Sequence, residues 1–437
     1  MPEEKFPSFE LKVFEKLEGR LGNIHDEKDR YKYIESIVKS LDPSIDKARI
    51  DRIVAESKVF QPIDRYLYDI GVEDIMVNNT ENIFVYHSDK GDQKAPESIS
   101  STEELDWFVK KLKMYATSVV ANRHVFDVHL PNGSRCNIID SPLGPDITIR
   151  NFKPNAYSII DLMNRGELSP QLAARFWLYA EGLGVRPANM LIGGMPGSGK
   201  STLLNAMFSF FRPEARVVVL EDTYELNTST QENCVRLETS PEVTLEDLLK
   251  NSLRMRPDLI IVGEVRGKEA IDMITAMSIG KAVMSTMHAH TTRDMATRLE
   301  HEPMKINKEI IPLVDIFAVV SQVNQDHQRV RRVTQVSETS GMETQVLMSD
   351  LYTYDYKTRK GSDILPSVTY RDVLSRATGR EPTEIIQEEN RRARTLERLN
   401  DLGIRDTRSI NEFCRDYYDN QAKALQKLGL QKLGTLD

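Results

Sequence analysis

The sequence predicts an α/β fold: a doubly wound domain built on a parallel sheet, preceded by a smaller α+β domain and flanked by helical extensions at both ends. Two observations carry this prediction. From residue 168 onward, short runs of wholly apolar residues alternate with helical patterns, as expected of buried parallel strands joined by helices. Ahead of them, residues 66–153 hold short β-rich runs separated by turn signals. A chain of 437 residues is long enough for two or more such domains.

The first part of the chain changes from a helical to a β-rich pattern. Residues 1–65 are charged and carry apolar residues at helical spacing, which predicts two or three amphipathic helices at the periphery. Pro131-Asn132-Gly133 marks a turn, so the run that contains it is expected to form a hairpin. One helix is expected over 103–121. The predicted strands of residues 66–153 are 75–79, 82–87, 126–140 and 147–152.

The larger domain is expected to begin after a linker. Residues 154–167 contain Pro154, Asn155 and Gly166 and are interpreted as that linker. The α/β domain follows over 168–345, and residues 346–437 are expected to be largely helical, with an exposed charged helix over 383–400. The predicted buried strands of the larger domain are 190–194, 216–222, 258–264 and 282–288.

Composition excludes several classes of protein. The 58 basic and 66 acidic residues give a net charge of -8, which argues against binding bulk nucleic acid or an anionic membrane through overall charge. No run approaches the 18 apolar residues of a membrane helix, and the N-terminus lacks a secretory signal pattern, so we expect a cytoplasmic protein. The cysteines are far apart and form no CxxC pair, which predicts buried, unpaired thiols; they are Cys136, Cys234 and Cys414.

A phosphate-binding pattern lies between a predicted strand and a predicted helix. The run GMPGSGKS fits G-x-x-x-x-G-K-[ST] in the strand–turn–helix context that this pattern needs. Its glycines allow backbone N–H groups to turn inward around phosphates, and the helix start adds a positive field. Lys200 is expected to neutralise the β and γ phosphates of ATP, and the Ser201 hydroxyl to bind Mg²⁺. The alternative is a glycine-rich structural turn. The predicted nucleotide-binding residues are Gly194, Pro196, Gly197, Ser198, Gly199, Lys200, Ser201 and Thr202.

Acidic residues follow two other predicted strands. Glu264 comes directly after the apolar run LIIVG, at the strand end where ligands bind in open α/β sheets. It is the candidate that aligns or deprotonates water. Many P-loop enzymes place a metal-supporting aspartate at this strand end, where this chain has Gly263. Another acid must therefore assist the metal. The run LEDTYE supplies it, with Glu225 and Glu221 ahead of Asp222, and the alternative for this run is an inert surface loop.

The order of these motifs resembles that of the secretion ATPases of the type II/type IV superfamily. The phosphate loop is followed by LEDTYEL, by LIIVGEVR and by STMHAHTT with Arg298-Leu299 beyond it, so the resemblance covers residues 70–340. It implies a RecA-like P-loop ATPase domain, a PAS-like N-terminal domain and a homohexameric motor. It also implies that His288 senses the γ-phosphate and that Arg266 ties the strand of Glu264 to the acidic run. A hydrogen-bonded core histidine is the alternative for His288.

The sequence departs from the family pattern at two places. Ile279-Gly280-Lys281 stands where the family usually has Thr-Gly-His, and His290 stands where Asn or Asp is common. Lys281 is interpreted as facing either phosphate or a subunit interface, and His290 as structural. Arg331-Arg332-Val333 and the charged C-terminal helix look most like archaeal members of the family.

Two arginines of the N-terminal domain complete the predicted site. Arg135 and Arg150 lie 15 residues apart on predicted strands, and in the family matching arginines reach the nucleotide. A guanidinium suits that role because it can stabilise charge spread over γ-phosphate oxygens. The alternative is that each arginine pairs with a carboxylate and holds the sheet. The predicted catalytic residues are therefore Glu264, Glu225, Glu221, His288, Arg135, Arg150 and Arg266, with Ser201 and Glu225 at the metal.

Three functions fit the motifs to different degrees. The leading hypothesis is a motor peripherally associated with the cytoplasmic face of a membrane, acting on a polytopic platform protein of a pilus, archaellum or secretion machine. A nucleic-acid motor would need a basic channel with stacking aromatics, which net acidity and 7% aromatic residues disfavour. A non-hydrolysing scaffold is disfavoured by Glu264 and the acidic run. The motifs do not distinguish between the filaments and secretion systems that such a motor could serve.

Overall fold

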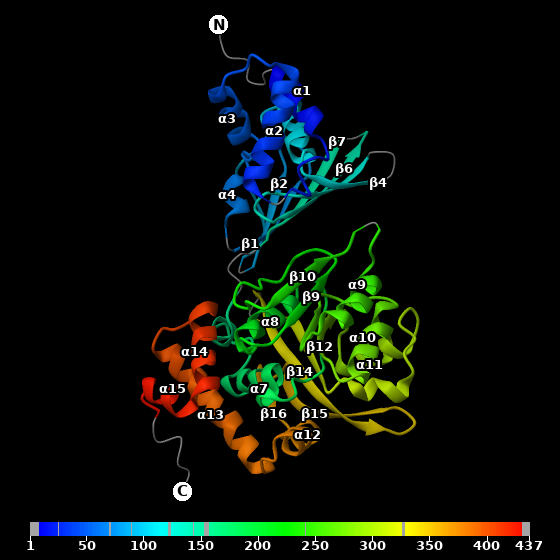
Figure 1. Ribbon diagram of the computed structural model, residues 1–437, viewed down its shortest axis with the longest axis vertical. Coiled ribbons are helices and arrows are strands. Elements are labelled where there is room, and N and C mark those ends of the chain that lie inside the picture. The colour runs from blue at the N-terminus through cyan, green and yellow to red at the C-terminus, as the bar shows by residue number, and fades with distance from the viewer. Residues whose placement is uncertain are drawn as a thin grey trace. The chain divides into compact units, whose positions relative to one another are not determined.

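The chain folds as two compact units, Met1–Pro154 and Asn155–Asp437 (Figure 1). The computed structural model describes residues 8–430 except 25, 70, 89, 121–123, 143, 153–156, 241 and 326–327. Each unit has its own sheet and its own apolar core. None of the helices in the described ranges combines the length and the apolar character that a membrane span needs.

The sheet of the N-terminal unit is antiparallel, with the strand order β3-β2-β1-β7-β6-β5-β4. The predicted hairpin over 126–140 is confirmed as β5 and β6, where Val125 pairs with Ile139 and His129 with Arg135. Its turn contains Gly133 in the left-handed region, at φ +87°. The strands are β1 (Val72–Val77), β2 (Ile83–His87), β3 (Gly91–Lys94), β4 (Ala116–Val120), β5 (Val125–His129), β6 (Arg135–Ser141) and β7 (Gly144–Arg150).

The N-terminal helices belong to the same core as this sheet. Phe14, Ile34 and Ile50 lie in one apolar cluster with Ile75 and Ile138 of the strands, so the expectation of a peripheral segment is wrong. The predicted helix over 103–121 is also too long, because the β-branched residues of 116–120 extend as β4 instead. The helices are α1 (Ser8–Leu17), α2 (Glu27–Leu41), α3 (Lys47–Glu56), α4 (Asp64–Leu67) and α5 (Thr102–Lys113).

The second unit is built on a sheet with the order β10-β9-β11-β12-β8-β13-β14-β15-β16. The first six strands of this order, from β10 to β13, pair with their neighbours in parallel. From β13 to β16 the neighbouring strands pair antiparallel. The four predicted buried strands are confirmed as β8, β9, β11 and β12, whose residues are all buried. The strands are β8 (Met190–Gly193), β9 (Val217–Glu221), β10 (Cys234–Glu238), β11 (Leu259–Val262), β12 (Ala282–Met287), β13 (Ile316–Gln325), β14 (Gln328–Met342), β15 (Val346–Asp355) and β16 (Lys360–Asp363).

Helices cover both faces of this sheet. Val217 and Val219 of β9 join one apolar cluster, whereas Val218 and Leu220 join the cluster on the opposite face. Both faces of the parallel strands are therefore buried, which explains their unbroken apolar sequence. The helices are α6 (Ile159–Asn164), α7 (Pro170–Glu181), α8 (Lys200–Ala206), α9 (Leu245–Ser252), α10 (Glu269–Ser278), α11 (Thr292–Glu300), α12 (Thr369–Thr378), α13 (Pro382–Asp401), α14 (Thr407–Asp419) and α15 (Gln421–Lys427), with 3₁₀ turns η1 (Gly182–Gly184), η2 (Met207–Phe210), η3 (Leu253–Met255) and η4 (Lys308–Leu313).

Two segments differ from their predicted structure. Much of the expected linker over 154–167 is helix α6, capped by Ser158 and buried through Ile159 and Ile160; residues 153–156 lie outside the described residues. The region 346–437 begins with β15 and β16 rather than with helix. Its buried Leu351 and Tyr352 are residues typical of strands or cores, and they join the core of the unit. The three cysteines are free thiols; Cys136 and Cys414 are buried as predicted, whereas Cys234 is only partly buried.

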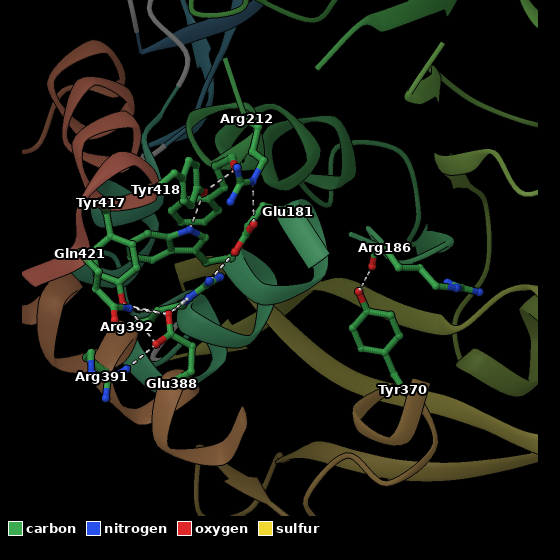
Figure 2. Close-up of polar contacts among 12 residues, drawn as sticks. Glu181, Arg186, Arg212, Tyr370, Glu388, Arg391, Arg392, Tyr417, Tyr418 and Gln421 are labelled. Atoms are coloured by element: carbon green, nitrogen blue, oxygen red, sulfur yellow. Dashed lines mark hydrogen bonds and ion pairs between the residues drawn. The ribbon is translucent and has the colours of Figure 1, made fainter. Parts of the chain in front are cut away.

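The charged helix expected over 383–400 is present in α13, but one of its faces is buried. Figure 2 shows Arg392 of this helix between Glu388, on the same helix, and Glu181, at the end of α7. Arg392 Nε lies 2.9 Å from Glu388 Oε1, and its Nη2 is bonded to Glu181 Oε1. Arg212 holds the second oxygen of Glu181 at 3.3 Å. Paired charges can be buried where single charges cannot, so α13 has a charged face in the core besides its exposed face.

This buried network also reaches the 3₁₀ turn η2, which continues directly from α8. Tyr418 donates to the carbonyl oxygen of Phe210 at 2.6 Å and accepts from Trp177 Nε1 at 2.6 Å. The Trp177 ring stacks on the Phe210 ring, with the ring centroids 5.1 Å apart. The centroid of the Tyr417 ring lies 5.0 Å from that of Trp177. The C-terminal helices are therefore packed against the far end of helix α8.

Candidate nucleotide-binding site

The phosphate-binding pattern forms the turn between β8 and α8. Gly194 has φ +157°, and a Cβ atom there would lie 2.4 Å from the carbonyl oxygen of Val320, so no other residue fits. Gly199 has φ +103° directly before the helix. The strand–turn–helix context predicted from the sequence is thus present, with Gly194 at its start and Lys200 at the first helical position.

Lys200 is buried at the inner side of this loop. Its Nζ donates to the carbonyl oxygen of Met195 at 3.3 Å and lies 3.3 Å from His288 Nδ1. Burial lowers the pKa of Lys200, while the charges of Glu264 and Glu225 act in the opposite direction. The lysine therefore lies in a site that already holds acidic groups, before any phosphate is considered.

Glu264 emerges at the end of β11 and contacts two basic side chains. Its Oε1 lies 2.8 Å from His288 Nε2 and 3.0 Å from Arg266 Nε, and its Oε2 accepts from Arg266 Nη2 at 3.1 Å. His288 Nδ1, on the other side of the ring, lies 3.3 Å from both Lys200 Nζ and the carbonyl oxygen of Gly194. Lys200, His288, Glu264 and Arg266 form one continuous chain of contacts, hereafter the catalytic-edge chain.

Two glutamates of the acidic run, Glu221 and Glu225, have different surroundings. Glu221 is 3% exposed, and its Oε1 accepts from the backbone N–H groups of Glu225 and Leu226 at 2.8 and 3.0 Å. Burial raises the pKa of Glu221 to about 7, against the nearby charge of Arg236. Glu225 faces the phosphate loop, where its Oε2 accepts from the Ser201 hydroxyl at 3.2 Å. Glu221 therefore shapes the loop that presents Glu225.

Arg266 interacts with the same acidic groups. Its pKa is raised first by the hydrogen bond with Glu264 and then by the charges of Glu264, Asp222 and Glu225. Arg266 is expected to connect the strand of Glu264 to the acidic run. In this structure its side chain donates a hydrogen bond to Glu264 and interacts with Asp222 and Glu225 of the acidic run through charge.

The residues at the loop fit a Mg²⁺ ion. Ser201 and Glu225 offer hard oxygen donors next to one another, and Mg²⁺ in nucleotide sites takes its remaining ligands from phosphates and water. The described residues contain no separate group of three or more His, Cys, Asp or Glu arranged to hold a metal. The assignment of Ser201 and Glu225 to the metal stays a prediction.

The two departures from the family pattern lie apart from this chain of contacts. Lys281 precedes β12, whereas His288 follows that strand, so the two residues lie at opposite ends of it. Lys281 Nζ donates to the carbonyl oxygen of Pro257 at 3.1 Å. The phosphate-facing interpretation of Lys281 is therefore wrong. His290 is exposed.

Arg135 and Arg150 are neighbours within the N-terminal unit. They are directly opposite one another on β6 and β7. Arg150 Nε also lies 3.1 Å from Asp74 Oδ1, on the adjacent strand β1. This ion pair fits the interpretation in which the arginine holds the sheet. The role of both arginines at phosphate stays a prediction.

Sequence reasoning missed two residues that contact the phosphate loop. Gln322 of β13 and Arg331 of β14 each donate to the carbonyl oxygen of Gly197 at 3.0 Å. The Arg331-Arg332 doublet was noticeable in the sequence, but nothing in its spacing connects it to a loop 134 positions earlier.

A P-loop with an acid and a histidine at the carboxyl edge of a parallel sheet defines a nucleotide-binding α/β protein of the RecA-like kind. The family model for type II/IV secretion system proteins matches residues 56–349, and the chain belongs to this family.

Several proteins of other organisms are similar in sequence to this chain. The uncharacterized protein MJ0900 of Methanocaldococcus jannaschii is 31% identical over 383 residues, covering 84% of this chain and 68% of that protein. The uncharacterized protein MJ0781 of the same organism is 38% identical over 228 residues, 49% of this chain but only 31% of that protein. A probable conjugal transfer protein TrbB of Sinorhizobium fredii is 30% identical over 284 residues, 62% of this chain and 85% of that protein.

Two ATPases are among the solved structures that match this chain. The ATPase DotB of Legionella pneumophila matches with 21% identity and a TM-score of 0.49, over 76% of this chain and 87% of DotB. The VirB11 ATPase of the Brucella suis type IV secretion system matches with 22% identity and a TM-score of 0.34, over 64% of this chain and 96% of VirB11.

Proposed function

We propose that the chain is an ATP-hydrolysing motor of the type II/IV secretion family. The observation that carries the proposal is the catalytic-edge chain, because it brings three separate motifs into contact at one edge of the sheet. A loop that binds phosphate, a histidine beside its lysine and an acid held by that histidine are the groups needed to cleave a terminal phosphate.

In this proposal, the loop amides and Lys200 hold the β and γ phosphates, and Glu264 orients the attacking water and accepts its proton. A carboxylate has about four acceptor sites. Arg266 Nη2 donates to Oε2 at 3.1 Å, while the contacts of His288 and Arg266 with Oε1 are ion pairs, so acceptor sites remain for a water. Mg²⁺, which Ser201 and Glu225 would hold, supplies charge neutralisation at the phosphate oxygens when bound.

The work of the motor is assigned to a membrane-bound machine. We expect a homohexamer on the cytoplasmic face of a membrane, acting on a polytopic platform protein of a type IV pilus, an archaellum or a secretion system. Membership of the type II/IV secretion family supports this assignment. A further relative, the type IV secretion system protein PtlH of Bordetella pertussis, also supports it; PtlH is 33% identical over 148 residues, 31% of this chain and 42% of that protein.

A nucleic-acid motor is the second candidate. It is favoured by relatives named for conjugal transfer, such as TrbB. The net charge of -8 counts against it, because nucleic-acid binding relies on neutralising phosphates with basic side chains. Stimulation of ATP turnover by single-stranded or double-stranded DNA would favour this candidate.

The test compares three variants with the parent protein. Lys200→Ala is expected to lose binding of a fluorescent ATP analogue, since it removes the ammonium from the loop. Glu264→Gln keeps the shape of the site and is expected to bind the analogue but to lose phosphate release with Mg²⁺ by at least about 100-fold. Glu300→Gln changes an exposed acid on α11 and serves as the matched control. Turnover at the parent rate by Glu264→Gln would refute its assignment and transfer the role to Glu225.

A further inference from the structure

The antiparallel hairpin of β13 and β14 lies against the phosphate loop. Strand β13 pairs with β8, the strand that leads into the loop, and the carbonyl oxygen of Val320 lies at the Gly194 backbone. Gln322 and Arg331 are directly opposite one another on β13 and β14. Side chains of directly opposed residues project from the same face of a sheet, so the two can converge on one target.

Their shared target is a single backbone oxygen. Gln322 Nε2 and Arg331 Nε each lie 3.0 Å from the carbonyl oxygen of Gly197, in the middle of the phosphate loop. A carbonyl oxygen has two lone pairs, and these two donors account for both. The aliphatic part of Arg331 also passes close to Gly199, 3.2 Å from where a Cβ atom would stand.

The direction of this carbonyl determines the direction of the next amide. In a trans peptide, the C=O of Gly197 and the N–H of Ser198 point to opposite sides. Two donors that hold the oxygen on the outside of the loop therefore keep the Ser198 N–H on the inside. The Ser198 N–H donates to Met195 O at 3.1 Å, and its hydroxyl is buried with no hydrogen-bond partner in the described part of the chain. The Ser198 N–H is therefore used within the turn, and the Ser198 hydroxyl is the group of this residue that is available to an oxyanion.

The neighbouring arginine anchors the hairpin on its other face. Arg332 donates to the carbonyl oxygen of Arg165 at 3.1 Å and to Gln325 Oε1 at 3.1 Å. The backbone N–H of Val333 donates to the carbonyl oxygen of Glu167 at 2.8 Å. The strand that carries Arg331 is therefore fixed to the segment at the start of the second unit, and Arg331 acts from a rigid support.

We propose that Gln322 and Arg331 are positioning residues that preset the phosphate loop for a nucleoside triphosphate by holding the Gly197 carbonyl outward. This inference rests on the proposed nucleotide-binding function of the loop. It gives a role to the Arg331-Arg332 doublet that the catalytic-edge chain does not use.

The test is a double-mutant cycle read out by nucleotide affinity. Gln322→Ala and Arg331→Ala should each weaken binding of a non-hydrolysable ATP analogue by about 3- to 10-fold, the range of one hydrogen bond. The double variant should lose more than the product of the two single losses, because only then does the carbonyl lose both donors. KM for ATP should rise with kcat largely retained, and the melting temperature without nucleotide should stay at the parent value, which a merely structural role would not predict.

Two further variants make the result decisive. Arg329→Ala removes an exposed arginine two positions earlier on the same strand and should leave affinity unchanged. Arg331→Gln keeps a donor without the charge and replaces Arg331→Ala if that variant does not fold. Unchanged affinity in both single variants, or losses that simply multiply in the double variant, would overturn the inference. A parent protein that binds no ATP analogue would instead refute the proposed function itself.

Discussion

Replacing Arg392 with Met should destabilise the second unit by about 3 kcal/mol at pH 7. The side chain of Arg392 is 2% exposed, and those of its partners Glu181 and Glu388 are 1% and 3% exposed. Removing one partner of a buried ion pair costs about 3–5 kcal/mol, because a charge is left uncompensated. Arg212 and Arg391 remain as partners of Glu181 and Glu388, so the lower end of this range applies.

The pKa of Glu388 shows how this stabilisation should depend on pH. Arg392, followed by the hydrogen bonds of Gln421 and Tyr417, lowers this pKa to about 2 in spite of burial. Because the folded-state pKa is depressed, this stabilisation is fully present above pH 4.5 and is lost as the pH falls toward 2.

Urea denaturation followed by the fluorescence of the buried Trp177 measures this loss. The difference between the parent and Arg392→Met should be largest at neutral pH and should shrink between pH 4.5 and the acid limit of the folded protein. Arg408→Met is the matched control, because the ion pair of Arg408 with Glu412 is exposed and worth well under 1 kcal/mol. A difference below about 1 kcal/mol at pH 7 would refute the argument that this network stabilises the packing of α13.

The remaining predictions concern the acidic run, the N-terminal arginines and assembly. Burial raises the pKa of Glu221 to about 7, so the contribution of this residue to stability is greatest below pH 4.5 and is lost as the pH rises through 7. In urea denaturation, Glu221→Gln should therefore be more stable than the parent at pH 8 and similar to it at pH 4.5. If Arg135 and Arg150 act on phosphate, their Ala variants should lose ATP turnover by about 10-fold or more at an unchanged melting temperature, whereas a purely structural Arg150 would lower that temperature as Asp74 loses its partner. Sedimentation with a non-hydrolysable ATP analogue should show a hexamer, and a monomer at high protein concentration would contradict the ring.

The sequence predicts the structure of a segment correctly where a single hydrophobic pattern determines that structure. Four predicted apolar runs form β8, β9, β11 and β12, because a strand that is buried on both faces needs apolar residues along its whole length. It was insufficient for α13, since charge alone does not reveal whether a face is solvated or paired inside the fold. Glu388 and Arg392 lie four positions apart, a spacing equally typical of an exposed helical ion pair. Only the partner from α7, Glu181, makes the buried alternative possible.

The same contrast explains which parts of the candidate site could be foreseen. Parallel strands bring their carboxyl ends to one edge, and the order β9-β11-β12-β8 places Glu264 between the acidic run and His288, with the phosphate loop next along. Motifs that follow strands can therefore be combined from sequence alone. Arg331 follows no such rule, because β14 is antiparallel to β13 and the arginine lies within the strand. Its contact with Gly197 depends on strand register, which the sequence does not display. The polar groups missed by motif reasoning are thus those that approach the loop from the antiparallel side of the sheet.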